Sequence, residues 1–216
     1  MNNLFSMDNG VFNFLGKMWD IIIISIIWAL LCIPIITIGP ATTALYYTVV
    51  KVIRRERGYL LREFFRSFKM NFLSGMILGV TLTVFYYILY IDMNFAKTIK
   101  DANMRFIMLG VFTAFSFIIL CSTIYVFPIL SRFTMGRLQI LKTALLMSVK
   151  HLPTTILMLI IVGFFALAIW IQPIFIFISS GICLFLCSLP LERVFKKYIP
   201  KTDKEEESKV DAWYLE

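Results

Sequence analysis

Apolar runs of about twenty residues constrain the fold of this chain more than any other feature. The first of them contains the segment IIIISIIWALLCI, which carries no charged side chain. About 20 apolar residues in a helix cross the roughly 30 Å of hydrocarbon in a bilayer. The chain is 60% hydrophobic and only 16% charged, which departs from the composition of soluble domains. We therefore predict an all-α fold, a polytopic bundle of membrane helices.

The boundaries of these runs predict about six membrane spans. They cover residues 17–36, 41–53, 72–91, 106–130, 153–171 and 173–189. The second span is short, about 20 Å if wholly helical. It therefore thins the bilayer, continues into the cations that follow it, or dips and returns. The spans form a single membrane domain over residues 1–191, and a charged tail follows over residues 192–216.

Basic residues gather in three segments between the spans, 51–69, 132–150 and 193–204. The turns that alternate with these segments are charge-poor or balanced. By the positive-inside rule, this pattern predicts that the basic segments and both termini lie in the cytoplasm. The formal net charge of +8 is explained by the same cations, so we expect no nucleic-acid partner.

The segment IPIITIGPATT predicts a helical hairpin between the first two spans. Pro34 and Pro40 lack backbone donors, and Gly39 tolerates a left-handed φ. We expect TIGP to end one helix and Pro40 to start the next. The predicted structural hairpin consists of Pro34, Thr37, Gly39, Pro40 and Ala41.

Two amphipathic helices are predicted at the membrane interface, over residues 59–70 and 136–151. The first places an apolar face with several phenylalanines opposite a charged face. Its predicted contact residues, together with the preceding cations, are Arg54, Arg55, Arg57, Phe64, Phe65, Phe68 and Lys69. Two interpretations stay open: this segment lies on anionic lipid, or it docks on a partner protein.

The sequence contains little that indicates catalysis. No ionisable residue lies at mid-depth in any predicted span, and no HExxH, GxSxG or P-loop motif occurs. His151 begins a helix and is interpreted as interfacial, and the four cysteines lie in apolar runs without the partners of a metal site. We predict that the protein is not an enzyme and has no catalytic residues, cofactor or metal site.

The segments PIITIGPATTALYYTVVK and FFRSFKMNF, with the basic cluster between them, resemble the YesL family of bacterial membrane proteins, a domain of unknown function. The most specific positions of the resemblance are Pro34, Thr37, Gly39, Pro40, Ala41, Asn71 and Phe72, and the resemblance covers nearly the whole chain. Thr43 stands where an alanine is commoner. The resemblance implies a Gram-positive type plasma membrane and genes that neighbour carbohydrate importers of the ATP-binding-cassette (ABC) class. It brings no established catalytic residues.

From this resemblance we expect a non-enzymatic accessory or regulatory protein of carbohydrate ABC-type import. Its expected partners are membrane lipids and the membrane subunits of the importer. The alternative is a small transporter or channel for a neutral solute such as a sugar. In that case Ser, Thr and Tyr side chains, with the backbone at Gly39 and Pro40, would line the path.

Overall fold

The computed structural model describes residues 10–198, and this part of the chain contains helices but no strand. The all-α prediction is confirmed. The helices are α1 (Gly10–Leu31), α2 (Ile38–Thr48), α3 (Leu60–Met70), α4 (Phe72–Thr98), α5 (Ala102–Arg132), α6 (Arg137–Lys150), α7 (Leu152–Ile171) and α8 (Ile176–Phe195). Two short 3-10 helices, η1 (Ile35–Thr37) and η3 (Pro173–Phe175), and a π-helix, η2 (Val49–Arg54), complete the described chain. Most of the predicted tail, residues 199–216, lies outside the described residues.

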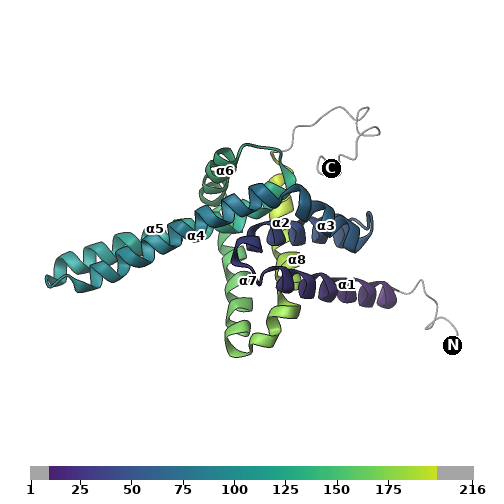
Figure 1. Ribbon diagram of the computed structural model, residues 1–216, viewed down its shortest axis with the longest axis horizontal. Helices are drawn as coiled ribbons and strands as arrows, with labels where there is room; N and C mark the ends of the chain where they lie inside the picture. Colours follow the sequence, from purple (N-terminus) through teal and green to yellow (C-terminus); the bar gives the residue numbers. More distant parts are fainter. Residues whose placement is uncertain (1–9, 199–216) are drawn as a thin grey trace.

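Helix α2 lies at the centre of the molecule and contacts α1, α3, α4, α5 and α8. The α4–α5 hairpin extends from it along the long axis of the molecule, whereas the α7–α8 hairpin runs across that axis (Figure 1). Helices α1 and α3 lie at the opposite end from the tip of α4–α5. The main core fills the centre of this arrangement and includes Tyr46, Leu78, Tyr125 and Leu191.

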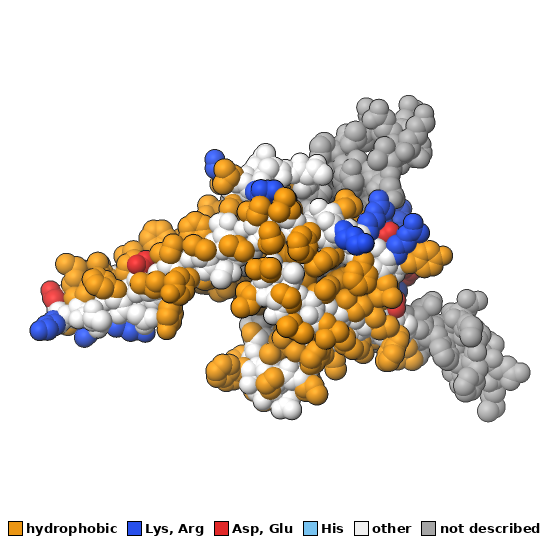
Figure 2. Space-filling model, in the orientation of Figure 1, with side chains coloured by type: hydrophobic (Ala, Val, Ile, Leu, Met, Phe, Trp, Pro, Cys, Tyr) orange, Lys and Arg blue, Asp and Glu red, His pale blue; other side chains and the backbone are white. Residues whose placement is uncertain are grey.

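Five helical stretches of the described chain are long and apolar enough to cross a membrane. They are Ile35–Arg54, Phe72–Thr98, Ala102–Arg132, Leu152–Ile171 and Pro173–Phe195, which correspond to the predicted second to sixth spans. The predicted first span, residues 17–36, is not among the five. Hydrophobic side chains cover much of the visible surface of the α4–α5 hairpin (Figure 2), as a lipid-facing surface requires. The protein is a multi-pass membrane protein.

The connection between α4 and α5 is shorter than predicted. The sequence predicts a polar loop over residues 92–105, but α4 continues to Thr98 and α5 begins at Ala102. Asp101 caps α5 by accepting a hydrogen bond from the backbone N–H of Asn103 at 3.0 Å. Residues 92–98 include polar side chains but no proline or glycine to stop the helix. The sequence also predicts a break of this helix at Pro128, but α5 continues through Pro128 to Arg132.

The hairpin between α1 and α2 reverses before Gly39, over residues 32–37. The Thr37 hydroxyl donates to the backbone carbonyls of Leu31 and Pro34 and so closes the turn. Pro40 lies in the first turn of α2, where a missing N–H costs little. The second helix begins at Ile38, two residues before the predicted start at Pro40.

Gly39 has a different role from the predicted one. Its φ is not positive, since among the described residues only Glu56 and Gly58 have positive φ, so a left-handed Gly39 does not end the first helix. Instead, Gly39 lets α2 approach α4. A Cβ atom at Gly39 would overlap the carbonyl oxygen of Gly75, and a Cβ at Gly75 would lie 2.7 Å from the Pro40 nitrogen.

Candidate functional site

Two adjacent tyrosines of α2 reach two buried carboxylates on different helices. The Tyr46 hydroxyl donates to Glu192 Oε1 of α8 at 2.9 Å, and the Tyr47 hydroxyl donates to Glu63 Oε2 of α3 at 3.3 Å. Consecutive residues of a helix point in different directions, so a single turn of α2 serves both carboxylates. Only 4% of Glu192 and 7% of Glu63 is exposed, so each carboxylate needs a compensating cation.

In the Glu192 cluster, Arg132 is the main cation. Arg132 Nη2 lies 2.8 Å from Glu192 Oε2, and the Arg132 side chain is fully buried. Arg55 Nη2 lies 3.7 Å from the same oxygen. Arg54 Nη1 donates at 2.9 Å to the carbonyl of Ser188, one turn earlier in α8. These contacts join the C-terminal ends of α5 and α8 to the segment that follows α2.

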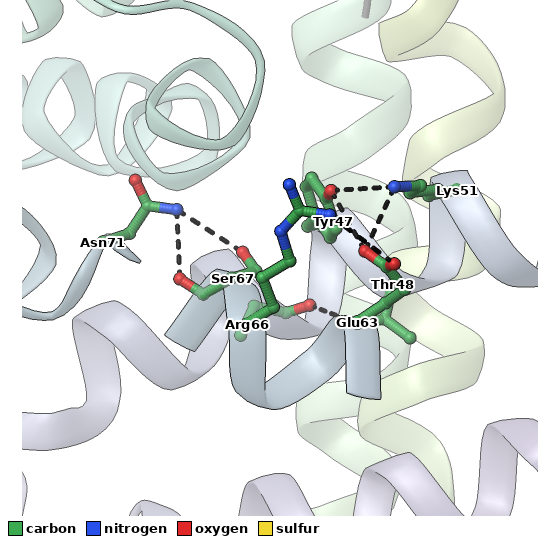
Figure 3. Close-up of polar contacts among 8 residues, drawn as sticks. Tyr47, Thr48, Lys51, Glu63, Arg66, Ser67 and Asn71 are labelled. Atoms are coloured by element: carbon green, nitrogen blue, oxygen red, sulfur yellow. Dashed lines mark hydrogen bonds and ion pairs between the residues drawn. The ribbon is translucent and has the colours of Figure 1, made fainter. Parts of the chain in front are cut away.

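In the Glu63 cluster, Lys51 is the main cation (Figure 3). Lys51 Nζ lies 3.1 Å from Glu63 Oε2, and both side chains are buried. Lys51 also donates to the Tyr47 hydroxyl at 3.3 Å, and Arg66 Nη1 lies 3.9 Å from Glu63 Oε1. Glu63 lies in the first turn of α3, so this cluster holds the start of α3 against α2 and η2.

A cavity of about 150 Å³ lies next to the Glu63 cluster, between α2, α3 and the end of α5. Its polar lining includes Tyr47, Arg66, Asn71, Ser131 and Thr134. Asn71, between α3 and α4, donates through Nδ2 to the Ser67 carbonyl at 3.1 Å. The cavity is therefore lined by the amide of Asn71, which is held by Ser67, by the guanidinium of Arg66, and by hydroxyl groups of Tyr47, Ser131 and Thr134.

Two ionisable groups outside the spans have shifted pKa values. Lys17 lowers the pKa of the Glu56 carboxyl through a hydrogen bond and through its charge. Partial burial lowers the pKa of His151, and the charges of Lys197 and Lys150 lower it further. His151 Nε2 lies 2.9 Å from the Tyr198 hydroxyl. Both groups lie at the ends of helices, where the chain passes between spans.

The predicted aromatic contacts of α3 divide between its two faces. Phe64 is fully buried in a core with Ile24, Leu45 and Val49. The prediction that Phe64 docks on a partner is therefore wrong, because its ring already fills the protein's own core. Phe65 is 42% exposed. Phe68 is half-buried and packs against Phe72, with ring centroids 5.5 Å apart.

The predicted basic contacts also divide. Arg54 and Arg55 bind α8, as described above. Arg57 and Lys69 are exposed. The structure thus brings Arg54 and Arg55 into the Glu192 cluster, and it leaves Arg57 and Lys69 on the surface. The exposed part of the predicted contact set consists of Arg57, Phe65 and Lys69.

Sequence reasoning missed the four charged residues of the two clusters, Lys51, Glu63, Arg132 and Glu192. Glu63 was assigned to the charged face of an amphipathic helix and Glu192 to the start of the tail. One signal was available: Lys51 lies between apolar residues in a segment that continues a span, and such a cation requires a buried partner.

The chemistry of the clusters is that of structural ion pairs. Each carboxylate has a cation and a tyrosine hydroxyl within contact distance. Among residues 10–198, no group of three or more His, Cys, Asp and Glu side chains is arranged to hold a metal ion. The Glu63 and Glu192 clusters hold three helices, α3, α5 and α8, in fixed positions around α2.

Comparison with known proteins identifies relatives of this fold. Residues 21–93 match the family described as "Protein of unknown function, DUF624". The chain is 29% identical over 157 residues to "Uncharacterized protein YteU" of Bacillus subtilis (strain 168), which covers 72% of this chain and 70% of that protein. It is 24% identical over 213 residues to "Uncharacterized protein YesL" of the same organism, which covers 96% of this chain and 98% of that protein. These matches confirm the resemblance to the YesL family.

The part of the chain that matches the DUF624 family runs from within α1 to within α4. It includes the Gly39–Gly75 contact, both tyrosines of α2 and the whole of the Glu63 cluster. Arg132 and Glu192 lie outside the matched residues. No solved structure matches the chain.

Proposed function

We propose that this protein is a non-enzymatic accessory or regulatory protein of carbohydrate ABC-type import in a bacterial plasma membrane. The connection to an importer rests on the family resemblance. The single structural observation that supports a docking role is the outer face of α3, formed by Leu61, Arg62, Phe65 and Lys69, all of which are exposed. We place this face and both termini in the cytoplasm, following the positive-inside rule.

The outer face of α3 has the properties of a preformed docking surface. Leu61 is 49% exposed and Phe65 is 42% exposed, while Arg62 and Lys69 add positive charge beside them. Apolar anchors and surrounding charge are the usual components of a protein interface. Because Glu63 and Phe64 hold the opposite side of the same helix, docking on it does not require the helix to become ordered.

The test is recovery of the importer's membrane subunits with the full-length protein in mild detergent. Phe65→Ala is expected to weaken the complex mainly through faster dissociation, because it removes a central anchor. Neutralising Arg62 and Lys69 together is expected to slow association and flatten its salt dependence. Leu146→Ala is the matched control, since Leu146 is a 66% exposed apolar residue on α6, the second amphipathic helix.

Equal recovery with all variants, when each inserts correctly into the membrane, would contradict the docking proposal and leave α3 as a lipid-surface helix. A neutral-solute transporter makes a different prediction. The purified protein alone, in sealed liposomes, would then carry sugar across the bilayer, whereas an accessory protein would not.

A further inference from the structure

The cavity beside the Glu63 cluster lies at the level where two spans end. α3 ends at Met70, α4 begins at Phe72, and α5 ends at Arg132. Asn71 and Arg132 both line the cavity. The start of the candidate span Phe72–Thr98 and the end of the candidate span Ala102–Arg132 therefore lie at the cavity. Hydrocarbon gives way to headgroups at the ends of such spans, so the cavity lies at headgroup level.

The surroundings of the cavity are electropositive. The cations of the two clusters are Lys51, Arg54, Arg55, Arg66 and Arg132, and their carboxylates are Glu63 and Glu192. Five cations and two carboxylates leave a formal local charge of +3. Lysines and arginines also gather on the surface at this end of the molecule (Figure 2). A cavity in such a field favours an anion over a cation or a neutral solute.

The lining provides donors of the type that bind oxyanions. Arg66 is a guanidinium on the rim, with a half-exposed side chain. Thr134 contributes a hydroxyl. Tyr47, Ser131 and Asn71 complete the polar lining, but each already donates within the protein, to Glu63, the Pro128 carbonyl and Ser67 respectively. Hydrogen bonds from a guanidinium to phosphate oxygens are among the strongest in proteins. A cavity of about 150 Å³ accepts a molecule the size of benzene, and a phosphate group is slightly smaller.

We propose that this cavity is a binding site for a phosphate group, with Arg66 as its principal ligand. The phosphate belongs either to a phospholipid headgroup or to a soluble phosphate compound. Met70, Leu130 and Phe133 form apolar walls next to the polar lining, and these would contact the glycerol and first acyl carbons of a lipid. This site is independent of the α3 docking surface, whose charges Arg62 and Lys69 do not line the cavity.

The experiment uses the full chain and two probes. Inorganic phosphate is titrated into the protein in a non-ionic detergent against chloride at equal ionic strength, and retention of phosphatidylglycerol after purification is measured by native mass spectrometry. Arg66→Gln removes a charge-assisted hydrogen bond, so binding of the relevant probe is expected to fall at least about tenfold. Thr134→Ala, in an exposed loop, is expected to reduce it by about two- to tenfold.

Lys69→Gln is the matched control, because Lys69 is an exposed cation on α3 that does not line the cavity. Loss of inorganic phosphate binding in Arg66→Gln, with Lys69→Gln unchanged, supports the site and assigns it to a soluble phosphate. The same pattern for retained phosphatidylglycerol alone assigns it to a lipid. If neither probe binds, or if Lys69→Gln reduces binding as much as Arg66→Gln, the proposal is overturned.

Discussion

The close approach of α2 and α4 at Gly39 and Gly75 predicts that a methyl group at either position destabilises the protein. In Gly39→Ala, the new methyl group would overlap the carbonyl oxygen of Gly75. The obstructing atom is backbone, so it cannot be relieved by rotation of a side chain. α2 must therefore move away from α4, which disturbs packing on both sides. Strain of this kind costs about 1–3 kcal/mol of unfolding free energy.

For a chain of this length, each kcal/mol lowers the melting temperature by about 2–4 °C. Gly39→Ala should thus melt about 2–12 °C below the parent in detergent, followed by near-ultraviolet circular dichroism. Gly75→Ala should behave similarly, since its methyl group would lie 2.7 Å from the Pro40 nitrogen. Gly39→Leu adds more atoms at the same place and should lower the yield of folded protein.

Gly79 provides the matched control for this prediction. A Cβ atom there would lie 3.6 Å from Gly39 Cα, an ordinary van der Waals contact. Gly79→Ala should be neutral or stabilise the protein by up to about 1 kcal/mol, because alanine favours the helix over glycine. If Gly39→Ala melts like the parent, α2 and α4 do not approach as closely as the structure shows. If Gly79→Ala lowers the melting temperature as much as Gly39→Ala, the close contact at Gly39 is not the cause of the loss.

Three further predictions concern charge and topology. Glu192→Ala leaves a buried guanidinium without its carboxylate and should cost about 3–5 kcal/mol in detergent melting; an unchanged melting curve would contradict the Glu192 cluster. The pKa of His151, the single histidine, should lie below 6.5 when measured by NMR, because burial and the charges of Lys197 and Lys150 lower it. Lys150→Gln should raise this pKa, because it removes one of those charges. The contribution of His151 to stability is therefore present above pH 6.5 and is lost as the pH falls through the lowered pKa. In a cysteine-free background, Asn103→Cys should react with an impermeant thiol reagent from outside and Arg57→Cys should not; the reverse would refute the topology.

Helix positions were predictable where apolar runs have clear ends. The predicted starts at residues 72 and 153 lie within one residue of those of α4 and α7, because Asn71 and Pro153 mark helix boundaries. The α4–α5 turn was not predictable from charge. Asp92, Asn94, Lys97 and Thr98 are polar, yet residues 92–98 extend α4 beyond its apolar run. Polarity indicates exposure to water or headgroups, but it does not by itself end a helix.

The candidate site was less predictable, because its residues are brought together by tertiary packing. Tyr46 and Glu192 are separated by 146 positions in the sequence, and no local pattern connects them. Within α3, the spacing of apolar residues in the sequence predicts Glu63 on the charged face and Phe65 on the apolar face. The structure buries Glu63 and exposes Phe65. Glu63 is buried because it pairs with Lys51, a buried cation of the preceding segment.

The π-helical turn of η2 explains how one short segment serves both clusters. In a regular α-helix, residues three apart lie on the same face, so Lys51 and Arg54 would point together. Here Lys51 binds Glu63 of α3, whereas Arg54 binds the Ser188 carbonyl of α8. A π-helix has more residues per turn than an α-helix, which rotates Arg54 away from the face of Lys51. The π-helical turn therefore lets the α2–η2 segment contact α3 through Lys51 and α8 through Arg54, on different sides of the segment.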